Sequence, residues 1–243
     1  MKQSEILDCI LNELESVPDH KITGVVCGAH IVAVESMKCG IATWASGHHP
    51  VSLDDLPVQP LKESARETAR FLLSEDALKA SIGLATINSL LPDPAPECLK
   101  EINAGDLILQ YGKGKNVVVI GHFPFVENMG KRFADFKVLE KNPRNGDLDE
   151  REASRILPRA DLVAITATTL SNGTLAGILD LTPPDSVKML IGPSTPLCTA
   201  LFDVGIDILA GTLVKDNNIV KEGITLGCSF KQLKGVKHVV WMK

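Results

Sequence analysis

The sequence predicts an α/β protein in which a small α+β domain, residues 1–96, precedes a larger domain with a parallel, doubly wound sheet, residues 97–243. Two observations predict this fold class. Beyond residue 97, short apolar runs that suit buried strands alternate with helical segments over short connections, as in a parallel sheet. Before it, three prolines between Pro92 and Pro96 cannot continue a helix and make a stiff connector, which we take as the domain boundary.

The first domain begins with a helical pattern and continues with a β-rich stretch. Ser4 is the expected N-cap of the first helix. Small residues in the last helix, among them Ala80 and Gly83, imply close packing against another backbone. The expected helices are 4–17, 61–73 and 77–91; the expected strands lie in 22–34, with a hairpin turn at Gly28, and in 39–44; residues 47–55 are expected to form a loop.

The second domain repeats strand and helix. Its apolar runs are rich in β-branched residues, which suits strands that are buried on both faces. The last segment, 219–242, contains a β-like run, 236–241, that could complete the sheet or form an interface. The expected strands are 117–120, 136–140, 161–166, 187–191 and 206–214, and the expected helices are 125–133, 150–157, 172–181 and 196–204.

The first strand of this domain is followed by Gly121, and Pro124 has the fixed φ that suits the first turn of a helix. This is the opening of a nucleotide-binding unit, but only one glycine of the dinucleotide fingerprint is present, which argues against a bound dinucleotide. Glu140 lies 19 residues after Gly121, close to the spacing at which an acid meets a ribose hydroxyl. The alternative is an acid that ends a strand in solvent.

Ligands of open α/β sheets sit outside the carboxyl ends of the strands, so the residues at those ends are the candidate site. Ser194 or Thr195 would lie near the N-terminus of a helix that Pro196 opens, where an anion or a carbonyl can bind. Ser and Thr at such places also serve as helix caps. The candidate binding residues are Gly121, His122, Phe123, Pro124, Glu140, Asn142, Thr166, Thr168, Gly192, Pro193 and Ser194.

Three residues are candidates for catalysis. His122 follows the first strand of the second domain and could be an acid–base group or a metal ligand; the alternative is a hydrogen bond to the neighbouring loop. Glu35 directly follows an apolar strand, and Asn88 interrupts an apolar helix, so these two are the expected contributions of the small domain to a shared site. We name no metal ligands, because the spacing of Cys27, His30, Cys39 and His48-His49 is irregular.

Composition excludes several classes of function. A net charge of −5 gives no electrostatic case for nucleic acid, and aromatic residues at 4% argue against a base-stacking surface. No apolar run approaches the length of a membrane span, and the first residues lack the apolar core of a signal peptide. The six cysteines include no C-x-x-C pair and are expected to be reduced. We therefore expect a cytoplasmic protein that meets neither nucleic acid nor membrane.

The strand-end motifs carry a resemblance to a known family. The matching segments are 119–124, 140–143, 160–161, 166–169, 172–175 and 191–196, together with 83–88 in the small domain. In these segments the chain resembles the putative heavy-metal chelation family, a bacterial and archaeal group. The resemblance implies an enolase-N-terminal-like domain followed by a Rossmann-like domain, and a site between the two. It also implies a role in making or handling a small molecule that chelates a metal.

We therefore expect an enzyme that binds an adenosine-containing or pterin-like molecule in the cleft between the domains. The reaction would be a condensation, hydrolysis or group transfer in the metabolism of a pterin-, flavin- or siderophore-like chelator. The alternative is a non-enzymatic protein that binds a metal–chelate complex, with His122 as a ligand. A third reading is a scaffold without a small ligand. The oligomeric state stays open, and a homo-oligomer is compatible with the sequence.

Overall fold

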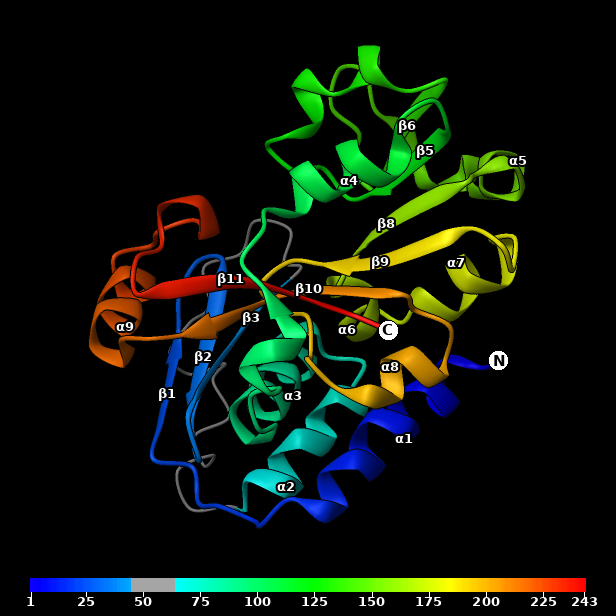
Figure 1. The fold of residues 1–243 in the computed structure, drawn as a ribbon. Helices are drawn as coiled ribbons and strands as arrows, with labels where there is room; N and C mark the ends of the chain where they lie inside the picture. Colours follow the sequence, from blue (N-terminus) through cyan, green and yellow to red (C-terminus); the bar gives the residue numbers. More distant parts are fainter. Residues whose placement is uncertain (45–63) are drawn as a thin grey trace.

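The computed structural model describes residues 1–44 and 64–243, which form a small antiparallel sheet and a larger mixed sheet (Figure 1). The small sheet has the order β1 (Gly24–Cys27), β2 (Ile31–Glu35), β3 (Cys39–Thr43). The large sheet has the order β4 (Leu99–Lys100), β11 (Val236–Met242), β10 (Ile208–Val214), β9 (Val187–Ile191), β8 (Leu162–Thr166), β5 (Asn116–Ile120), β6 (Asp135–Glu140), β7 (Leu148–Asp149). The α-helices of the described residues are α1 (Gln3–Glu13), α2 (Ala65–Ala69), α3 (Ala77–Leu90), α4 (Ala104–Gly112), α5 (Ala153–Ile156), α6 (Thr168–Ser171), α7 (Leu175–Leu181), α8 (Thr199–Asp203) and α9 (Asn217–Thr225).

The large sheet confirms the predicted fold class. Its strands from β10 through β9, β8, β5 and β6 to β7 are parallel. The chain passes from β5 to β6 and β7 on one side and then returns to β8 on the other side of β5. The point where the direction reverses, between β5 and β8, is where open α/β sheets bind their ligands.

The final segment completes the large sheet. β11 runs antiparallel to β10 from Val236, opposite Val214, to Met242, opposite Ile208. On its other side it pairs with the short strand β4. The question that the sequence left open for residues 236–241 is therefore settled in favour of the sheet.

The small domain is built around α3, of which eleven of the fourteen residues are buried. A helix that is apolar on all sides needs neighbours on all sides, and α3 packs against β2 and β3, against α2 and against α6 of the large domain. A Cβ atom on Gly83 would lie 2.2 Å from the backbone N of Leu72, and one on Gly40 would lie 2.2 Å from the carbonyl O of Ala85. The predicted close packing of the helix through small residues is confirmed.

The two domains share one hydrophobic core. Apolar side chains of α1 and α3, such as Ile10 and Ile87, belong to the same buried cluster as Val163 and Leu209 of the large sheet. Helix α1 packs against α7 and α8, and Figure 1 shows it beside α8. A continuous core holds the domains in a fixed relation, because opening it would expose apolar surface to water.

Three expected helices differ from the structure. Residues 125–133 form two 3₁₀ turns, Val126–Asn128 and Gly130–Arg132, in place of an α-helix that Pro124 opens. Gly130 lowers helix stability by about 1 kcal/mol relative to alanine. The expected helix 172–181 begins only at Leu175, as α7, because Gly173 has a φ of +76° and separates it from the short helix α6 that precedes the expected range. The expected helix 150–157 is reduced to α5, with a 3₁₀ turn on each side.

The prediction that Pro196 opens a helix is also wrong, because α8 begins at Thr199. Glu13 of α1 decides this start: its carboxylate accepts the N–H groups of Thr199 and Ala200, at 3.0 and 2.7 Å. Ser194 and Thr195 therefore do not lie at the N-terminus of α8. The first helix likewise begins one residue before the expected cap Ser4, and Lys2 occupies the N-cap position, where its N–H donates to Glu5.

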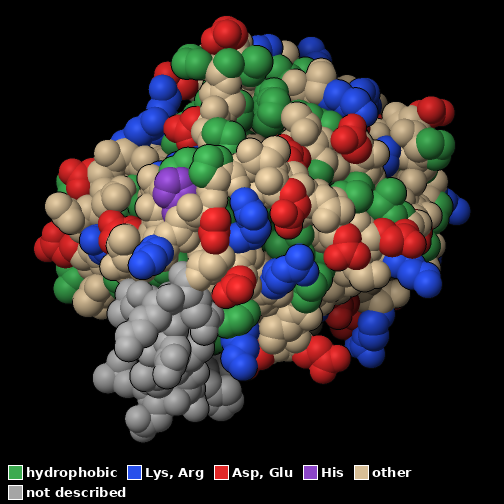
Figure 2. All heavy atoms as spheres, turned by 90° about the horizontal axis from the view of Figure 1, so that it is seen from below, with side chains coloured by type: hydrophobic (Ala, Val, Ile, Leu, Met, Phe, Trp, Pro, Cys, Tyr) green, Lys and Arg blue, Asp and Glu red, His purple; other side chains and the backbone are tan. Residues whose placement is uncertain are grey.

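Among the described residues, no helix is long and apolar enough to cross a bilayer. On the face that Figure 2 shows, Lys and Arg side chains are mixed with Asp and Glu side chains. The expected loop 47–55, with His48-His49, lies outside the described residues.

Candidate functional site

Two neighbouring cavities lie at the carboxyl edge of the large sheet. The first, which we call the β5–β6 cavity, has a volume of about 620 Å³, and the second, the inter-domain cavity, has about 720 Å³. Phe123 and Thr166 line both, so the two cavities meet at the switch point between β5 and β8. Polar residues of the β5–β6 cavity include His122, Glu140, Lys141, Asn142, Glu150, Thr166, Thr168, Asn172 and Thr174; the inter-domain cavity includes Thr43, Asn103, Phe123, Pro124, Phe125, Gly192, Pro193, Ser194, Thr212, Phe230, Lys231 and His238.

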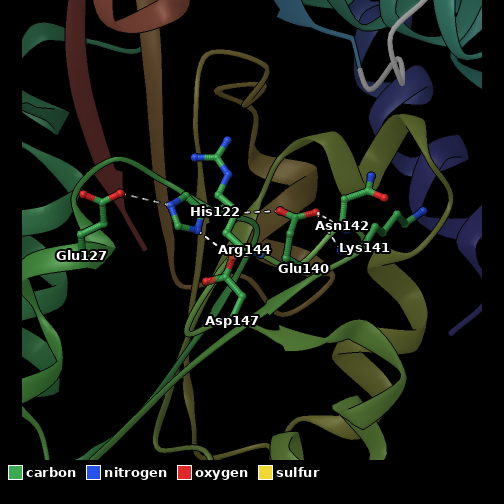
Figure 3. A network of polar contacts seen from close by, with 7 residues as sticks. All are labelled: His122, Glu127, Glu140, Lys141, Asn142, Arg144 and Asp147. Atoms are coloured by element: carbon green, nitrogen blue, oxygen red, sulfur yellow. Dashed lines mark hydrogen bonds and ion pairs between the residues drawn. The ribbon is translucent and has the colours of Figure 1, made fainter.

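His122 is held by a buried carboxylate (Figure 3). Its Nδ1 lies 2.8 Å from Oδ2 of Asp147, and the side chains are only 8% and 3% exposed. An ionised carboxylate can only accept, so Nδ1 carries a proton, and in the neutral imidazole Nε2 then presents a lone pair. Nε2 is covered and has no hydrogen-bond partner among the described residues. The nearest carboxylate oxygen, Oε1 of Glu127, is 3.8 Å away.

Asp147 is a site residue that the sequence analysis missed. It lies in the turn after β6, where its N–H donates to the carbonyl of Arg144 and its Oδ2 accepts the N–H of Arg144 at 3.0 Å. Gly146, with φ +96°, makes this turn possible. The Asn-Gly-Asp sequence signals a turn, but no local pattern indicates that the turn folds back onto His122.

Glu140 closes the end of β6 over the turn that follows β5. Its Oε2 accepts the N–H of His122 at 2.9 Å, and its Oε1 accepts the N–H of Lys141 at 2.7 Å. The N–H of Asn142 is 3.4 Å from the same Oε1. The carboxylate thus orders the turn at His122 and faces the β5–β6 cavity with its remaining lone pairs. Its proposed contact with a ribose hydroxyl stays a prediction.

Gly121 is required where β5 passes β8. Its φ is +100°, and a Cβ atom there would lie 3.2 Å from Cβ and Cγ2 of Thr166. Thr166 and Thr168 face one another, with their hydroxyl oxygens 3.0 Å apart. The structure therefore brings Gly121, His122, Glu140, Asn142, Thr166 and Thr168 together around the β5–β6 cavity, as the strand-end argument predicts they should lie.

Gly192, Pro193 and Ser194 lie at the other cavity, on the boundary between the domains. Ser194 Oγ accepts the N–H of Thr43 at 2.8 Å and is 2.9 Å from the Thr43 hydroxyl. Asn88 donates from Nδ2 to the carbonyl of Ile41 at 2.9 Å and to that of Ser194 at 3.3 Å. Asn88 thus joins β3 to the loop after β9 by hydrogen bonds and lines neither cavity. Its role in the structure is to hold the two domains together.

Glu35 lies apart from both cavities. Its Oε2 is 3.0 Å from Nζ of Lys221, and its Oε1 accepts from Asn217 at 3.1 Å, so it binds β2 to α9. The structure does not bring Glu35 to His122, because the end of β2 faces α9 and not the end of β5.

The cysteines of the small sheet are protonated thiols at neutral pH in the metal-free protein. Burial raises the pKa of the Cys27 thiol to about 11 and that of Cys39 to about 12, whereas a metal binds the thiolate. Over residues 1–44 and 64–243, no three His, Cys, Asp or Glu side chains gather as a ready metal site. His48 and His49 lie outside this range.

Comparison with known proteins identifies the family. Sequence models of the DUF364 and DUF4213 families, both described as putative heavy-metal chelation, match residues 103–243 and 8–91. An uncharacterized protein of Methanocaldococcus jannaschii is 31% identical over 149 residues, 59% of this chain and 58% of that protein. The chain thus spans just over half of the length of this relative.

Two crystal structures of proteins of unknown function from the DUF364 family share the fold. The one from Desulfitobacterium hafniense is 30% identical, with a TM-score of 0.85 over 99% of this chain and 98% of that chain. The one from Pyrococcus horikoshii is 20% identical, with a TM-score of 0.79 over the full length of both chains. The resemblance seen in the strand-end motifs is confirmed, and the chain belongs to the DUF364 family, which is described as putative heavy-metal chelation.

Proposed function

We propose that the protein is an enzyme that acts on a small organic molecule at the carboxyl edge of the large sheet, in the synthesis or handling of a metal chelator. The observation that carries the proposal is the buried Asp147–His122 pair beside a cavity of about 620 Å³. Cavities of this size hold a small molecule or a cofactor. The cavity also offers Glu140 and two threonine hydroxyls as hydrogen-bonding groups for a sugar or an amine.

The pair suits proton transfer. Asp147 fixes the tautomer of His122 and leaves Nε2 as the basic atom, which is how a carboxylate orients a catalytic imidazole. Nε2 faces Glu127, whose side chain is 69% exposed and costs little to displace. A ligand group that replaces this carboxylate would meet Nε2 directly, and His122 would then accept or donate the proton of the reacting group.

A specific observation also favours a second function, the binding of a metal–chelate complex without turnover. An imidazole whose Nδ1–H is held by a carboxylate is the usual form of a histidine that ligates a metal. Nε2 of His122 is unpartnered within the described part of the chain, and the Glu127 carboxylate lies beside it. In this function the chelator would bring most of the ligands, and His122 would supply one.

The first experiment is a native mass spectrum of the purified protein and of Gly177→Leu. Gly177 lines the β5–β6 cavity and a Cβ atom on it meets nothing within 4 Å, so a leucine there should occupy part of the cavity. We expect an organic mass in the wild type that Gly177→Leu lacks. The matched control is Gly130→Leu, which lies outside both cavities and has room for a side chain. A mass retained equally by all three proteins would contradict the proposal.

His122→Ala separates the two functions. An enzyme should keep the retained molecule and lose its conversion, whereas a chelate-binding protein should lose the molecule together with its metal. A variant that keeps both ligand and activity would overturn both roles of His122.

We also propose two domains, 1–96 and 97–243, with the small one of the enolase N-terminal type, since its antiparallel strands are followed by helices. We place the protein in the cytoplasm because all six cysteines are free thiols, as a reducing compartment keeps them.

A further inference from the structure

We propose that the inter-domain cavity is an acid-binding site that takes a flat aromatic ring carrying an anionic group. The ring would lie against phenylalanine side chains, and the anion would lie at the mouth beside Lys231 and His238. The inference rests on the proposed function in one respect: this cavity meets the β5–β6 cavity at Thr166 and Phe123, so the acid would be a substrate of the same site.

The charges of the two cavities differ. The described residues that line the inter-domain cavity include no Asp or Glu; their ionisable side chains are Lys231 and His238. The β5–β6 cavity, in contrast, has the carboxylates of Glu140 and Glu150. Lys231 forms no ion pair with any acid of the described chain. A cation without a partner at the mouth of a cavity favours an anionic ligand and disfavours a cationic one.

The uncharged polar groups of this cavity also favour an anionic ligand, because they include a hydrogen-bond donor that is free among the described residues. Oδ1 of Asn103 accepts the N–H of Gly105 at 2.7 Å, which fixes the side-chain amide and leaves its NH₂ group as a donor. The Ser194 hydroxyl is already engaged with Thr43 of the small domain. The NH₂ group of Asn103 and the ammonium group of Lys231 can therefore donate hydrogen bonds to a ligand. A carboxylate or a sulfonate would supply the acceptor oxygens.

Two pairs of aromatic rings line the cavity. Phe123 and Phe125 are stacked with ring centroids 5.2 Å apart and planes within 7° of each other. In the second pair, Phe230 meets the His238 ring edge to face, with centroids also 5.2 Å apart. A planar ligand ring can add to such pairs in a stacked or edge-to-face arrangement, which a non-planar aliphatic ligand cannot do.

The exposed position of Lys231 and His238 keeps the cost of binding an anion low. Lys231 and His238 are exposed, whereas Ala167, Ile191 and Ala210 at the floor are buried. The anionic group would thus remain partly hydrated while the ring leaves water, which avoids the desolvation penalty of a buried charge. This division of the cavity points to an amphipathic acid rather than to a compact anion such as phosphate.

The test is isothermal titration calorimetry of the full chain with 2-naphthoate and with 2-naphthylmethylammonium, which share a ring and differ in charge. We expect 2-naphthoate to bind on the order of tenfold more tightly than the cation. Lys231→Glu should weaken 2-naphthoate by about tenfold or more, and His238→Ala should weaken it to a smaller extent. Lys234→Glu, an exposed lysine that lines neither cavity, is the charge-matched control and should leave binding unchanged.

Three outcomes would overturn the inference: no binding of 2-naphthoate, equal binding of the two probes, or equal effects of Lys231→Glu and Lys234→Glu. The failure of the proposed function would be seen elsewhere, in Gly177→Leu and His122→Ala, which alter the β5–β6 cavity. Binding of 2-naphthoate that survives Gly177→Leu supports an acid that lies in the inter-domain cavity. Binding that Gly177→Leu abolishes places the acid in the wrong cavity and overturns the inference.

Discussion

The two cavities at the carboxyl edge of the large sheet are neighbours, yet they are built in different ways. The β5–β6 cavity takes its polar groups from the ends of adjacent strands of one sheet and from the turn that carries Asp147. The inter-domain cavity depends on Thr43 of the small sheet and on the bonds that join it to Ser194. A site of the first kind follows from the order of the strands, whereas a site of the second kind exists only where two domains pack.

This difference can be tested by disturbing one cavity while the other is observed. Each cavity has its own probe: the retained molecule for the β5–β6 cavity and 2-naphthoate for the inter-domain cavity. The four changes below are ordered from the largest expected effect to the smallest.

Gly40→Ala should have the largest effect, and it should act on the inter-domain cavity. Its Cβ atom would lie 2.2 Å from the carbonyl O of Ala85 and 2.3 Å from the N of Ser89, so β3 must move away from α3. We expect a loss of about 3 kcal/mol in the free energy of unfolding, measured in urea. The control Gly177→Ala adds a Cβ atom in open space. Equal stability of the two variants would contradict the close packing of α3.

Asp147→Asn should disturb the β5–β6 cavity alone. The change removes the charge that holds the buried His122 ring, and we expect a loss of about 2 kcal/mol in the free energy of unfolding. The retained molecule should bind more weakly, and 2-naphthoate should bind as before. Asp135→Asn, which alters an exposed carboxylate, is the control. An equal weakening of both probes would show that the cavities are not independent.

Ser194→Ala should affect the inter-domain cavity and leave the β5–β6 cavity unchanged, the reverse of Asp147→Asn. It leaves the N–H of Thr43 without its acceptor at the boundary between the domains, at an expected cost of about 1 kcal/mol in the free energy of unfolding. The 2-naphthoate affinity should fall, while the retained molecule stays bound. In a double-mutant cycle with Thr43→Val, the effects should be less than additive, because the two hydroxyls share one contact. Additive effects would argue against that contact.

The smallest effect is a loss of stability at alkaline pH, and it should arise in the small sheet. Burial raises the pKa of Cys27 from 9.0 to about 11 and that of Cys39 to about 12. Above pH 9 the unfolded chain releases these protons while the folded chain retains them, so the stability present below pH 9 is lost as the pH rises toward 11. We expect a loss of about 0.4 kcal/mol per thiol at pH 9 relative to pH 7.

Cys27→Ala should reduce this dependence on pH, and Cys98→Ala, which alters an exposed thiol, should leave it unchanged. The measurement is urea unfolding between pH 7 and pH 9. A pH dependence that is identical in the wild type and in Cys27→Ala would rule out the contribution of this thiol.

Local patterns could predict a large part of the fold. The β-branched run 117–120 is a buried strand, the alternation beyond it is a parallel sheet, and the small residues of α3 do pack against backbone. These features are encoded within a few residues of each other, because hydrophobic periodicity and glycine geometry act locally. The same reasoning failed for residues 196–204, where the start of the helix depends on Glu13, far along the chain.

The sequence by itself determined the succession of strands and helices along the chain and the polar groups at the strand ends, and so it pointed to His122, Glu140 and Thr166 as neighbours. Only the tertiary structure decided three contacts: Asp147 bonds to His122, Glu13 caps the N-terminus of α8, and Glu35 pairs with α9 and not with the site. The physical reason is the range of the interactions. Periodicity and turn chemistry act over a few residues, whereas hydrogen bonds and ion pairs between distant segments form only after the shared core has fixed the two domains against each other.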